Sequence, residues 1–178
     1  LLSRRQRQMC IRDRIYLEQI TREIDSDYYD MIGIVNQMSP NGLIGSVTES
    51  YLSVEDNYDR YFEQKSLREE LIKLGYVNTK LLGIAYYDPK EQKELIGNFN
   101  VRVLDPSYQT ISKVVVGAEN IIQAMHASYL GIRETPVLSV MRRVSFGNKR
   151  VLDIYAEIEP DMSVSDRLNK EKWPYTYM

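Results

Sequence analysis

The hydrophobic periodicity of the chain changes between Gly75 and Leu81, and this change limits the fold classes that are open to the chain. Before Gly75, apolar residues recur every three or four positions, as in amphipathic helices. After Leu81, most of them alternate or form short runs between turn residues, as in strands. This order predicts the α+β class, with N-terminal helices followed by a mostly antiparallel sheet of hairpins.

The first helical stretch is predicted over Ile15–Ile24, where apolar residues fall at helical spacing. Asp25-Ser26-Asp27 is expected to interrupt this helix and to cap the next stretch. The spacing over residues 28–38 favours a helix. An alternative remains open, in which residues 31–38 form a strand that enters a turn at Ser39-Pro40-Asn41-Gly42.

A longer helix is predicted from Ser46, where Ser46-x-x-Glu49 matches a capping box, to Gly75, which is placed as its C-cap. A start nearer Ser53 is the alternative. We expect one apolar face to run along the whole helix and to pack as core or helix–helix contact. Its members are Val47, Tyr51, Val54, Tyr58, Tyr61, Phe62, Leu67, Leu71 and Leu74.

The second half of the chain is predicted to contain five strands and one further helix. The helix is expected over Ala118–Leu130, packed on the sheet and ended by Gly131, and the section 111–145 could then form a right-handed βαβ crossover. The predicted strands are Leu81–Tyr87, Leu95–Leu104, Ile111–Val116, Val137–Val144 and Val151–Ile158.

Residues 4–14 resemble a translated sequencing-library adapter of the transposon type, which encodes the same residues in one frame without a gap. This resemblance implies that residues 1–14 are non-native and that the natural start lies outside the sequence; the natural end is open in the same way. The domain is then expected over 15–160, with a helical part at about 15–76, a β-rich part at about 79–160 and an irregular tail at 161–178.

Removal of the first fourteen residues changes the charge and cysteine content. Because five arginines and one aspartate leave, Lys+Arg falls from 23 to 18, Asp+Glu falls from 25 to 24, and the net charge moves from −2 to −6. Cys10 leaves as well, so disulfides and thiolate chemistry are not expected. Cytoplasmic location is the default, and no membrane span, metal or cofactor is expected.

Two small polar features have simple structural explanations. Asp25, Asp27 and Asp30 have a spacing that suits a hard cation, but Tyr29 stands where an EF-hand loop needs Asp or Asn, and helix capping explains the cluster. His126 is the only histidine and is predicted to lie mid-helix beside an apolar stripe, where histidines are usually packed.

Tyrosine is strongly over-represented, with 14 Tyr against 3 Phe. Tyrosine combines apolar area with a polar tip and suits partly hydrated contact surfaces. Neighbouring residues point in different directions in a strand or a helix, so at least one tyrosine of each adjacent pair is expected to be exposed. The predicted protein-contact residues are Tyr28, Tyr29, Tyr86 and Tyr87.

The last hairpin carries a basic cluster that could contact phosphates. With Gly147-Asn148 as a two-residue turn, Arg142 is expected opposite Asp153, Val144 opposite Val151, and Met141 opposite Ile154. The cations left over are candidate nucleic-acid contacts, together with one arginine near the preceding helix: Arg133, Arg143, Lys149 and Arg150.

Three classes of function follow. The absence of a catalytic signature and the excess of tyrosine favour a non-catalytic binding or assembly module, with an unknown protein partner or a second copy of the chain. The alternative is a nucleic-acid-binding protein that uses the hairpin at 142–150. A carboxylate-dependent enzyme is the second alternative, since acidic residues are plentiful but show no catalytic spacing.

Overall fold

The computed structural model describes residues 4–98, 113, 115, 117, 119–130, 136–147 and 149–160. The chain divides into two compact units, one over Asp30–Pro160 and the other including residues 4–29. Helix α1 spans Arg4–Met38, so its last residues belong to the larger unit. The larger unit holds the whole sheet and is the part of the molecule that positions the candidate site.

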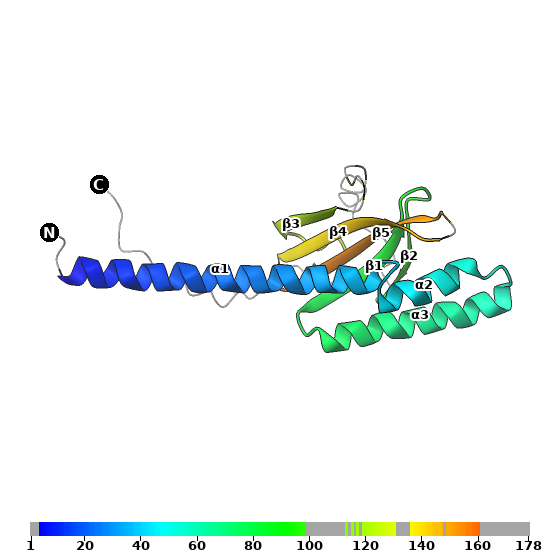
Figure 1. Cartoon of the computed structure of the whole chain (residues 1–178), viewed down its shortest axis with the longest axis horizontal. Helices are drawn as coiled ribbons and strands as arrows, with labels where there is room; N and C mark the ends of the chain where they lie inside the picture. The colour runs from blue at the N-terminus through cyan, green and yellow to red at the C-terminus, as the bar shows by residue number, and fades with distance from the viewer. Residues whose placement is uncertain are drawn as a thin grey trace. The chain divides into compact units, whose positions relative to one another are not determined.

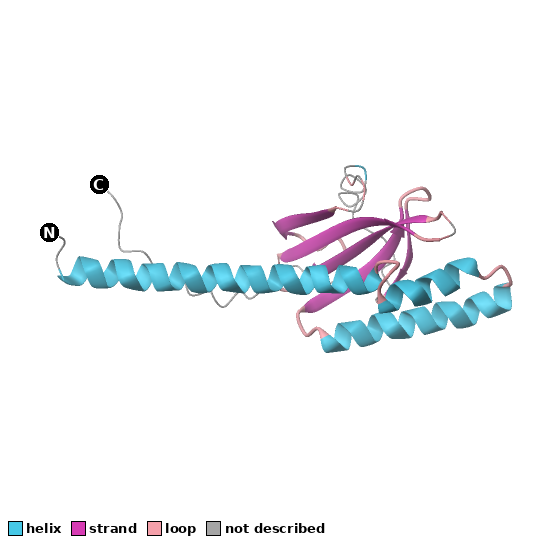
Figure 2. Cartoon of the chain, viewed as in Figure 1, coloured by secondary structure: helices cyan, strands magenta, loops and turns pink. Residues whose placement is uncertain are grey.

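The described chain is an α+β protein, as its sequence predicts, with three helices that precede five strands in the sequence (Figures 1 and 2). After α1 come α2 (Leu43–Ser53) and α3 (Asn57–Val77). The strands are β1 (Leu81–Asp88), β2 (Lys93–Gly97), β3 (Asn120–His126), β4 (Val137–Ser145) and β5 (Val151–Ile158).

The sheet has the order β2-β1-β5-β4-β3, and every pairing is antiparallel. Hairpins join β1 to β2 and β4 to β5, while the pairing of β1 with β5 joins these two hairpins into one sheet. β5 lies at the centre and β1 beside it, and both strands are buried along nearly their whole length.

The helices cover one face of the sheet and create the main core there. Even-numbered residues of the central strands point to this face, among them Ile84, Tyr86 and Ile154. They meet apolar side chains from the end of α1 and from α2 and α3, which are Met31, Ile34, Val35, Met38, Ile44, Leu67, Leu71 and Leu74. A smaller cluster on the opposite face contains Tyr87, Val115, Leu130, Met141 and Tyr155.

The end of α1 is fastened to the sheet and to the start of α2. The hydroxyl of Tyr86 donates to the carbonyl of Met38 at 2.5 Å, and Arg142 donates to Asn36 at 2.8 Å and to Ser39 at 3.1 Å. A Cβ on Gly45 would collide with the carbonyl of Ser39, so only glycine allows α2 to approach this turn so closely.

The structure favours the helical alternative for residues 28–38 and corrects two helix boundaries. Asp25-Ser26-Asp27 does not interrupt α1, because the helix continues through it to Met38, and Pro40 follows its end. The capping box at Ser46 is not used: the Ser46 hydroxyl donates back to Leu43 within α2, which is already helical there.

The helix predicted from Ser46 to Gly75 is two helices, α2 and α3. The chain leaves helical geometry at Val54, and Asp56 caps α3 by accepting from the backbone N–H groups of Tyr58 at 2.7 Å and Asp59 at 3.3 Å. α3 also continues past Gly75, since the backbone and side chain of Asn78 both donate to the carbonyl of Leu74. The side-chain cap at Asp56 explains why the second helix begins there.

The helix predicted over Ala118–Leu130 is wrong, because residues 120–126 form strand β3 and pair antiparallel with β4. The βαβ crossover is therefore absent. Pairing with β4 outweighs a local helical pattern here, as tertiary context commonly does for short apolar runs. Of the strand predicted over Ile111–Val116, only Lys113 and Val115 are described, and neither lies in a strand. The part of the second predicted strand beyond Asn98 lies outside the described residues.

Candidate functional site

Three aromatic side chains at the start of α3 are exposed and in contact with one another. Tyr58, Tyr61 and Phe62 have exposed fractions of 71%, 63% and 49%. The ring of Phe62 meets Tyr58 edge-to-face at 4.9 Å and Tyr61 edge-to-face at 5.7 Å between ring centroids. Such geometry is favourable for aromatic pairs. We call these three residues the α3 aromatic cluster.

The α3 aromatic cluster lies on the side of the helix that faces away from the core. A helix turns by about 100° per residue, so residues nine positions apart point in opposite directions. Tyr58 is thus opposite Leu67, and Phe62 is opposite Leu71, and both leucines are fully buried. The prediction that Tyr58 and Tyr61 belong to the core-facing side is therefore wrong.

The break between α2 and α3 is the physical reason for that error. The apolar pattern from Val47 to Leu74 looks continuous in the sequence, but residues 54–56 are not helical and change its phase. α2 and α3 form a helical hairpin, and in Figure 1 its turn lies beyond the end of the sheet. Residues at the start of α3 therefore lack a sheet surface to pack on.

The α3 aromatic cluster is bordered by carboxylates. Glu55, Asp56 and Asp59 are exposed and Glu63 is half-buried. Two cations lie close to these four carboxylates: Arg60, whose guanidinium donates to the carbonyl of Val54 at 2.8 Å and 3.3 Å, and the exposed Lys65, one helical turn after Tyr61 and Phe62. The surface therefore combines aromatic rings with negative charge.

Tyr86 and Tyr87 are both buried, with exposed fractions of 0% and 2%, so the prediction that one of them is exposed is wrong. Adjacent strand residues do point to opposite faces, but both faces of β1 are covered. Burial raises the pKa of both phenols, and the carboxylates of Asp153 and Asp88 raise that of Tyr87 further. Neither tyrosine offers surface for a protein contact.

Tyr28 and Tyr29 lie on α1, in the unit that includes residues 4–29. Their exposed fractions are 40% and 71%, and their rings meet edge-to-face at 5.6 Å. The exposure expected for this pair is confirmed. Their role as contact residues stays a prediction.

The hairpin of β4 and β5 has a register one residue different from the predicted one. Arg143, not Arg142, lies opposite Asp153, and Val144 lies opposite Leu152. In the turn, the backbone N–H of Lys149 donates to the carbonyl of Phe146, and the backbone N–H of Phe146 donates to the carbonyl of Arg150. Lys149 has a φ of 62°. This is a three-residue hairpin loop, which displaces the pairing relative to a two-residue turn.

Arg143 is therefore not available to phosphate. Its guanidinium donates to both carboxylate oxygens of Asp153, at 2.7 Å and 2.9 Å, and to the carbonyl of Val115 at 2.8 Å. Asp153 is fully buried, and bidentate pairing compensates its charge. This ion pair belongs to the interior of the sheet.

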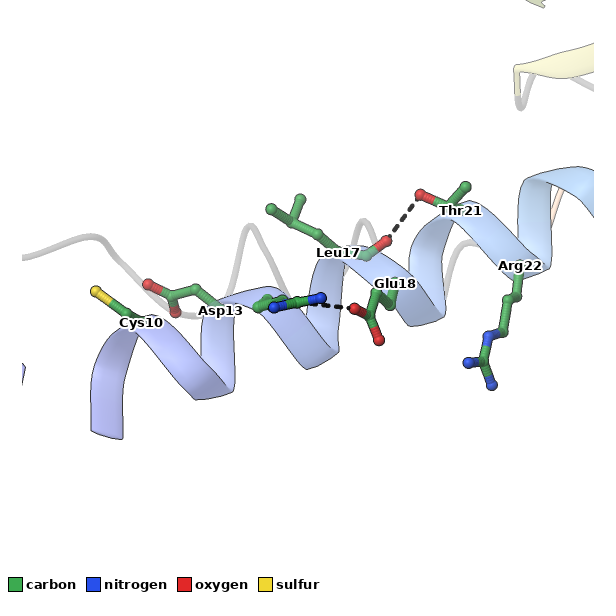
Figure 3. A pocket seen from close by; sticks show the side chains of 7 residues that line it. Cys10, Asp13, Leu17, Glu18, Thr21 and Arg22 are labelled. Carbon is green, nitrogen blue, oxygen red and sulfur yellow. Dashed lines mark hydrogen bonds and ion pairs between the residues drawn. The ribbon is translucent and has the colours of Figure 1, made fainter. Parts of the chain in front are cut away.

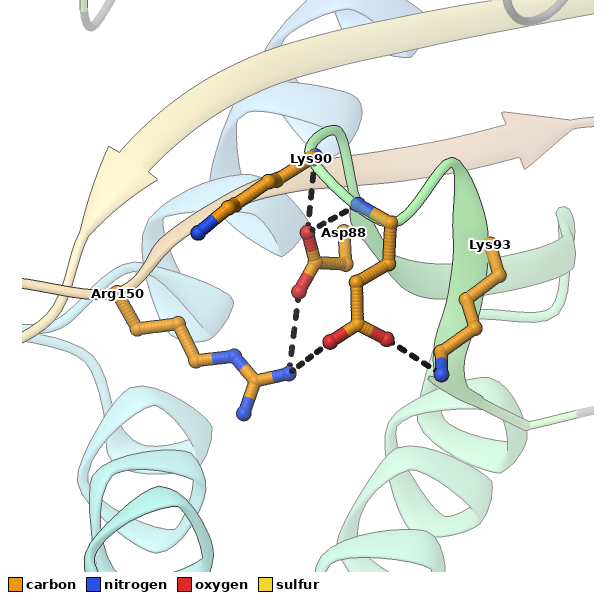
Figure 4. Close-up of polar contacts among 5 residues, drawn as sticks. Asp88, Lys90, Lys93 and Arg150 are labelled. Atoms are coloured by element: carbon orange, nitrogen blue, oxygen red, sulfur yellow. Dashed lines mark hydrogen bonds and ion pairs between the residues drawn. The ribbon is translucent and has the colours of Figure 1, made fainter.

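Arg150 is also engaged, in a network with the turn between β1 and β2 (Figure 4). It donates to Asp88 at 3.0 Å and approaches Glu91, which pairs with Lys93. Burial alone would raise the pKa of Asp88, but the N–H groups of Glu91 and Lys90 and the guanidinium of Arg150 lower it below its usual range. Among the predicted phosphate contacts, Lys149 is exposed, and Arg133 lies outside the described residues.

A buried carboxylate on the face opposite the helices was not anticipated. Glu157 accepts hydrogen bonds from Tyr155 Oη at 2.7 Å, Ser128 Oγ at 2.6 Å, and the backbone N–H groups of Tyr129 at 2.7 Å and Leu130 at 3.3 Å. These bonds fasten the segment after β3 to the central strand. The alternation of Asp153, Tyr155 and Glu157 in an otherwise apolar strand is the signal that could have revealed this polar face.

His126 lies in β3 rather than in a helix and contacts the same polar face. Its Nε2 is 2.6 Å from Ser139 Oγ, its Nδ1 is 2.7 Å from the carbonyl of Ala127, and its ring stacks on Tyr129 at 4.3 Å. Since a carbonyl only accepts, Nδ1 is the donor in the contact with Ala127. Ser139 is buried, so this pair holds β3 against β4 instead of presenting a nucleophile.

A hollow on α1 is lined by one helix only (Figure 3). Three of its lining residues, Cys10, Asp13 and Arg14, belong to the segment that resembles an adapter. We therefore assign it no role.

Asp25, Asp27 and Asp30 lie within α1 rather than at its start, so they do not cap it. Among the residues that the structure describes, no cluster of His, Cys, Asp or Glu is arranged to hold a metal.

Comparison with known proteins gives no family for the chain. No protein-family model matches it, and no curated protein is significantly similar to it in sequence. Over the described ranges, no helix has the length and apolar character needed to cross a bilayer.

Proposed function

We propose that the chain is a non-catalytic binding or assembly module that contacts another protein through exposed aromatic side chains. The observation that carries this proposal is the α3 aromatic cluster, in which rings that contact one another are exposed on the side of the helix that the core does not use. Aromatic residues are enriched where partners bind, and clustered exposed apolar surface marks such sites.

The α3 aromatic cluster takes the place that sequence analysis gave to Tyr86 and Tyr87. Tyr28 and Tyr29 remain candidates for a second contact because they are exposed. The proposal does not depend on them, since they lie in the other unit of the chain.

The nucleic-acid alternative has less support. Of its four cations, Arg143 and Arg150 are paired with Asp153 and Asp88, which offsets part of the positive charge that phosphate would meet. Among the residues that the structure describes, the polar cluster around Glu157 and Ser139 gives the enzyme alternative no support, because it is buried and hydrogen-bonded.

The test is a selection of binding peptides from an unbiased displayed library on the immobilised chain. The counter-target is the variant Tyr58→Ala, Tyr61→Ala, Phe62→Ala, which keeps helix propensity. Tyr76→Ala is the matched control, because Tyr76 is exposed on the same helix but far from the cluster. We expect peptides that bind the wild type and the control but not the triple variant. Enrichment of the same peptides on all three proteins, or of none, would contradict the proposal.

Sedimentation velocity of the wild type distinguishes the two kinds of partner. If the partner is a second copy, the sedimentation coefficient rises with concentration, and the triple variant stays monomeric. A wild type that stays monomeric while it still selects peptides assigns the surface to a different protein.

A further inference from the structure

We propose that the partner segment that docks on the α3 aromatic cluster is basic, with arginine as its preferred side chain. This inference rests on the proposed function and names the chemistry of the partner. It follows from the charges beside the cluster and from the way the nearby cation is held.

The carboxylates next to the cluster are positioned by the helix itself. Asp59 is one residue after Tyr58 and three before Phe62, and Glu63 follows Phe62 directly. Residues three and four apart on a helix are neighbours, so Asp59 and Glu63 form an acidic row along one side of the rings. In the described part of the chain, neither of them is paired with a lysine or arginine.

Arg60 does not neutralise this row. Its guanidinium bonds to the Val54 carbonyl, in the turn between α2 and α3. At about 100° per residue, Arg60 projects about 160° away from Phe62. The aromatic rings therefore keep a negative border on the side of Asp59 and Glu63, while the exposed Lys65 lies beside the rings on another side.

A basic partner satisfies both features of this surface. A guanidinium stacks on aromatic faces and bonds to carboxylates in the same contact, which an ammonium does less well. An apolar partner would cover the rings but would also desolvate Asp59 and Glu63 without any compensating charge, which weakens binding. An acidic partner would be repelled.

The test is a titration with labelled peptides that carry six arginines, six lysines or six glutamates, spaced by glycine and followed by fluorescence anisotropy. The proteins are the wild type, the aromatic triple variant, Tyr76→Ala, and an acidic-row variant, Asp59→Asn, Glu63→Gln. Asp56 is left unchanged because it caps α3. Circular dichroism confirms that each variant keeps its helices.

We expect the wild type and Tyr76→Ala to bind the arginine peptide more tightly than the lysine peptide and not to bind the glutamate peptide. Loss of the rings or of the acidic row is expected to weaken arginine-peptide binding by about tenfold, the size of ordinary cation–π and charge contacts. High salt is expected to reduce the effect of the acidic row more than that of the rings.

Two results would overturn the inference. If the aromatic triple variant binds the arginine peptide as well as the wild type does, the attraction is a general effect of an acidic chain. If the wild type does not bind it, the partner is not basic. The proposed function is judged separately, because a library selection that yields apolar or acidic peptides on the wild type alone supports the module and rejects only its basic partner.

Discussion

Phe62 and Leu71 lie nine residues apart on α3 and project from opposite sides of it: Leu71 is fully buried in the core, whereas the ring of Phe62 lies on the outer surface against Tyr58 and Tyr61. α3 is therefore apolar on two faces. The buried face explains why the helix packs where it does. The outer face has no role in that packing, which is why we assign it to a partner.

Replacing the α3 aromatic cluster is expected to leave stability nearly unchanged. Tyr58→Ala, Tyr61→Ala and Phe62→Ala should each change the free energy of unfolding by no more than about 0.5 kcal/mol, as exposed sites do. Leu71→Ala, on the other face of the same helix, should cost about 2–5 kcal/mol. Urea denaturation measures both. A large loss of stability in the aromatic variants would show that these rings belong to the core.

Loss of one partner of the Arg143–Asp153 ion pair is expected to destabilise the fold strongly, whereas replacement of both partners by apolar residues is expected to cost much less. Arg143→Met leaves a buried carboxylate without its counter-charge and should cost about 3–5 kcal/mol. The double variant Arg143→Met, Asp153→Leu should recover much of this loss, because no buried charge remains. A double-mutant cycle in urea checks the coupling. Additive losses would indicate that the two side chains do not interact.

Glu94 on β2 is expected to make stability fall as pH rises through the neutral range. Burial raises the pKa of this carboxyl from 4.5 to about 7, against the opposing charge of Arg68. Between these values the folded chain holds a proton that the unfolded chain has released, so the contribution to stability is full below pH 4.5 and is lost as pH rises through 7.

The variant Glu94→Gln isolates this contribution. It should be more stable than the wild type at pH 8, and the difference should shrink as the pH is lowered towards 5. Glu69→Gln, at an exposed position of α3, serves as the control and should show no such trend. Unfolding curves at several pH values measure the difference, and a constant gap between Glu94→Gln and the wild type would contradict the account.

Two glycines in helices are expected to respond oppositely to alanine. A Cβ at Gly45 would collide with the backbone of Ser39, so Gly45→Ala should destabilise the fold by about 1–3 kcal/mol. A Cβ at Gly33 meets nothing within 4 Å, so Gly33→Ala should stabilise α1 by up to about 1 kcal/mol. Thermal or urea unfolding measures the change in stability of each variant. Equal changes for Gly45→Ala and Gly33→Ala would refute the close approach at Gly45.

The sequence predicts the fold class and most strands because those features depend on local periodicity. β1, β4 and β5 lie within one residue of their predicted bounds, since each is a short apolar segment between turn residues. The local pattern of β3 is that of a helix, and its pairing with β4 is a long-range contact that a local pattern does not contain.

The candidate site was harder to predict, for three physical reasons. The turn at Val54 changes the phase of an apparently continuous apolar face, and this places Tyr58 and Phe62 outside the core. Segments distant in sequence cover both faces of β1. The residues next to Tyr86 and Tyr87 in the sequence therefore do not show that both side chains are buried. At the hairpin, one extra loop residue decided which arginine meets Asp153.

Mapping a selected peptide onto the chain by amide chemical-shift changes in two-dimensional NMR would locate its docking surface directly. We expect the largest changes between Asp56 and Lys65, and we expect them to be retained in Tyr76→Ala and to vanish in the aromatic triple variant. Changes centred on the β4–β5 hairpin, on α1, or on the sheet face around Glu157, with none at the start of α3, would contradict this expectation.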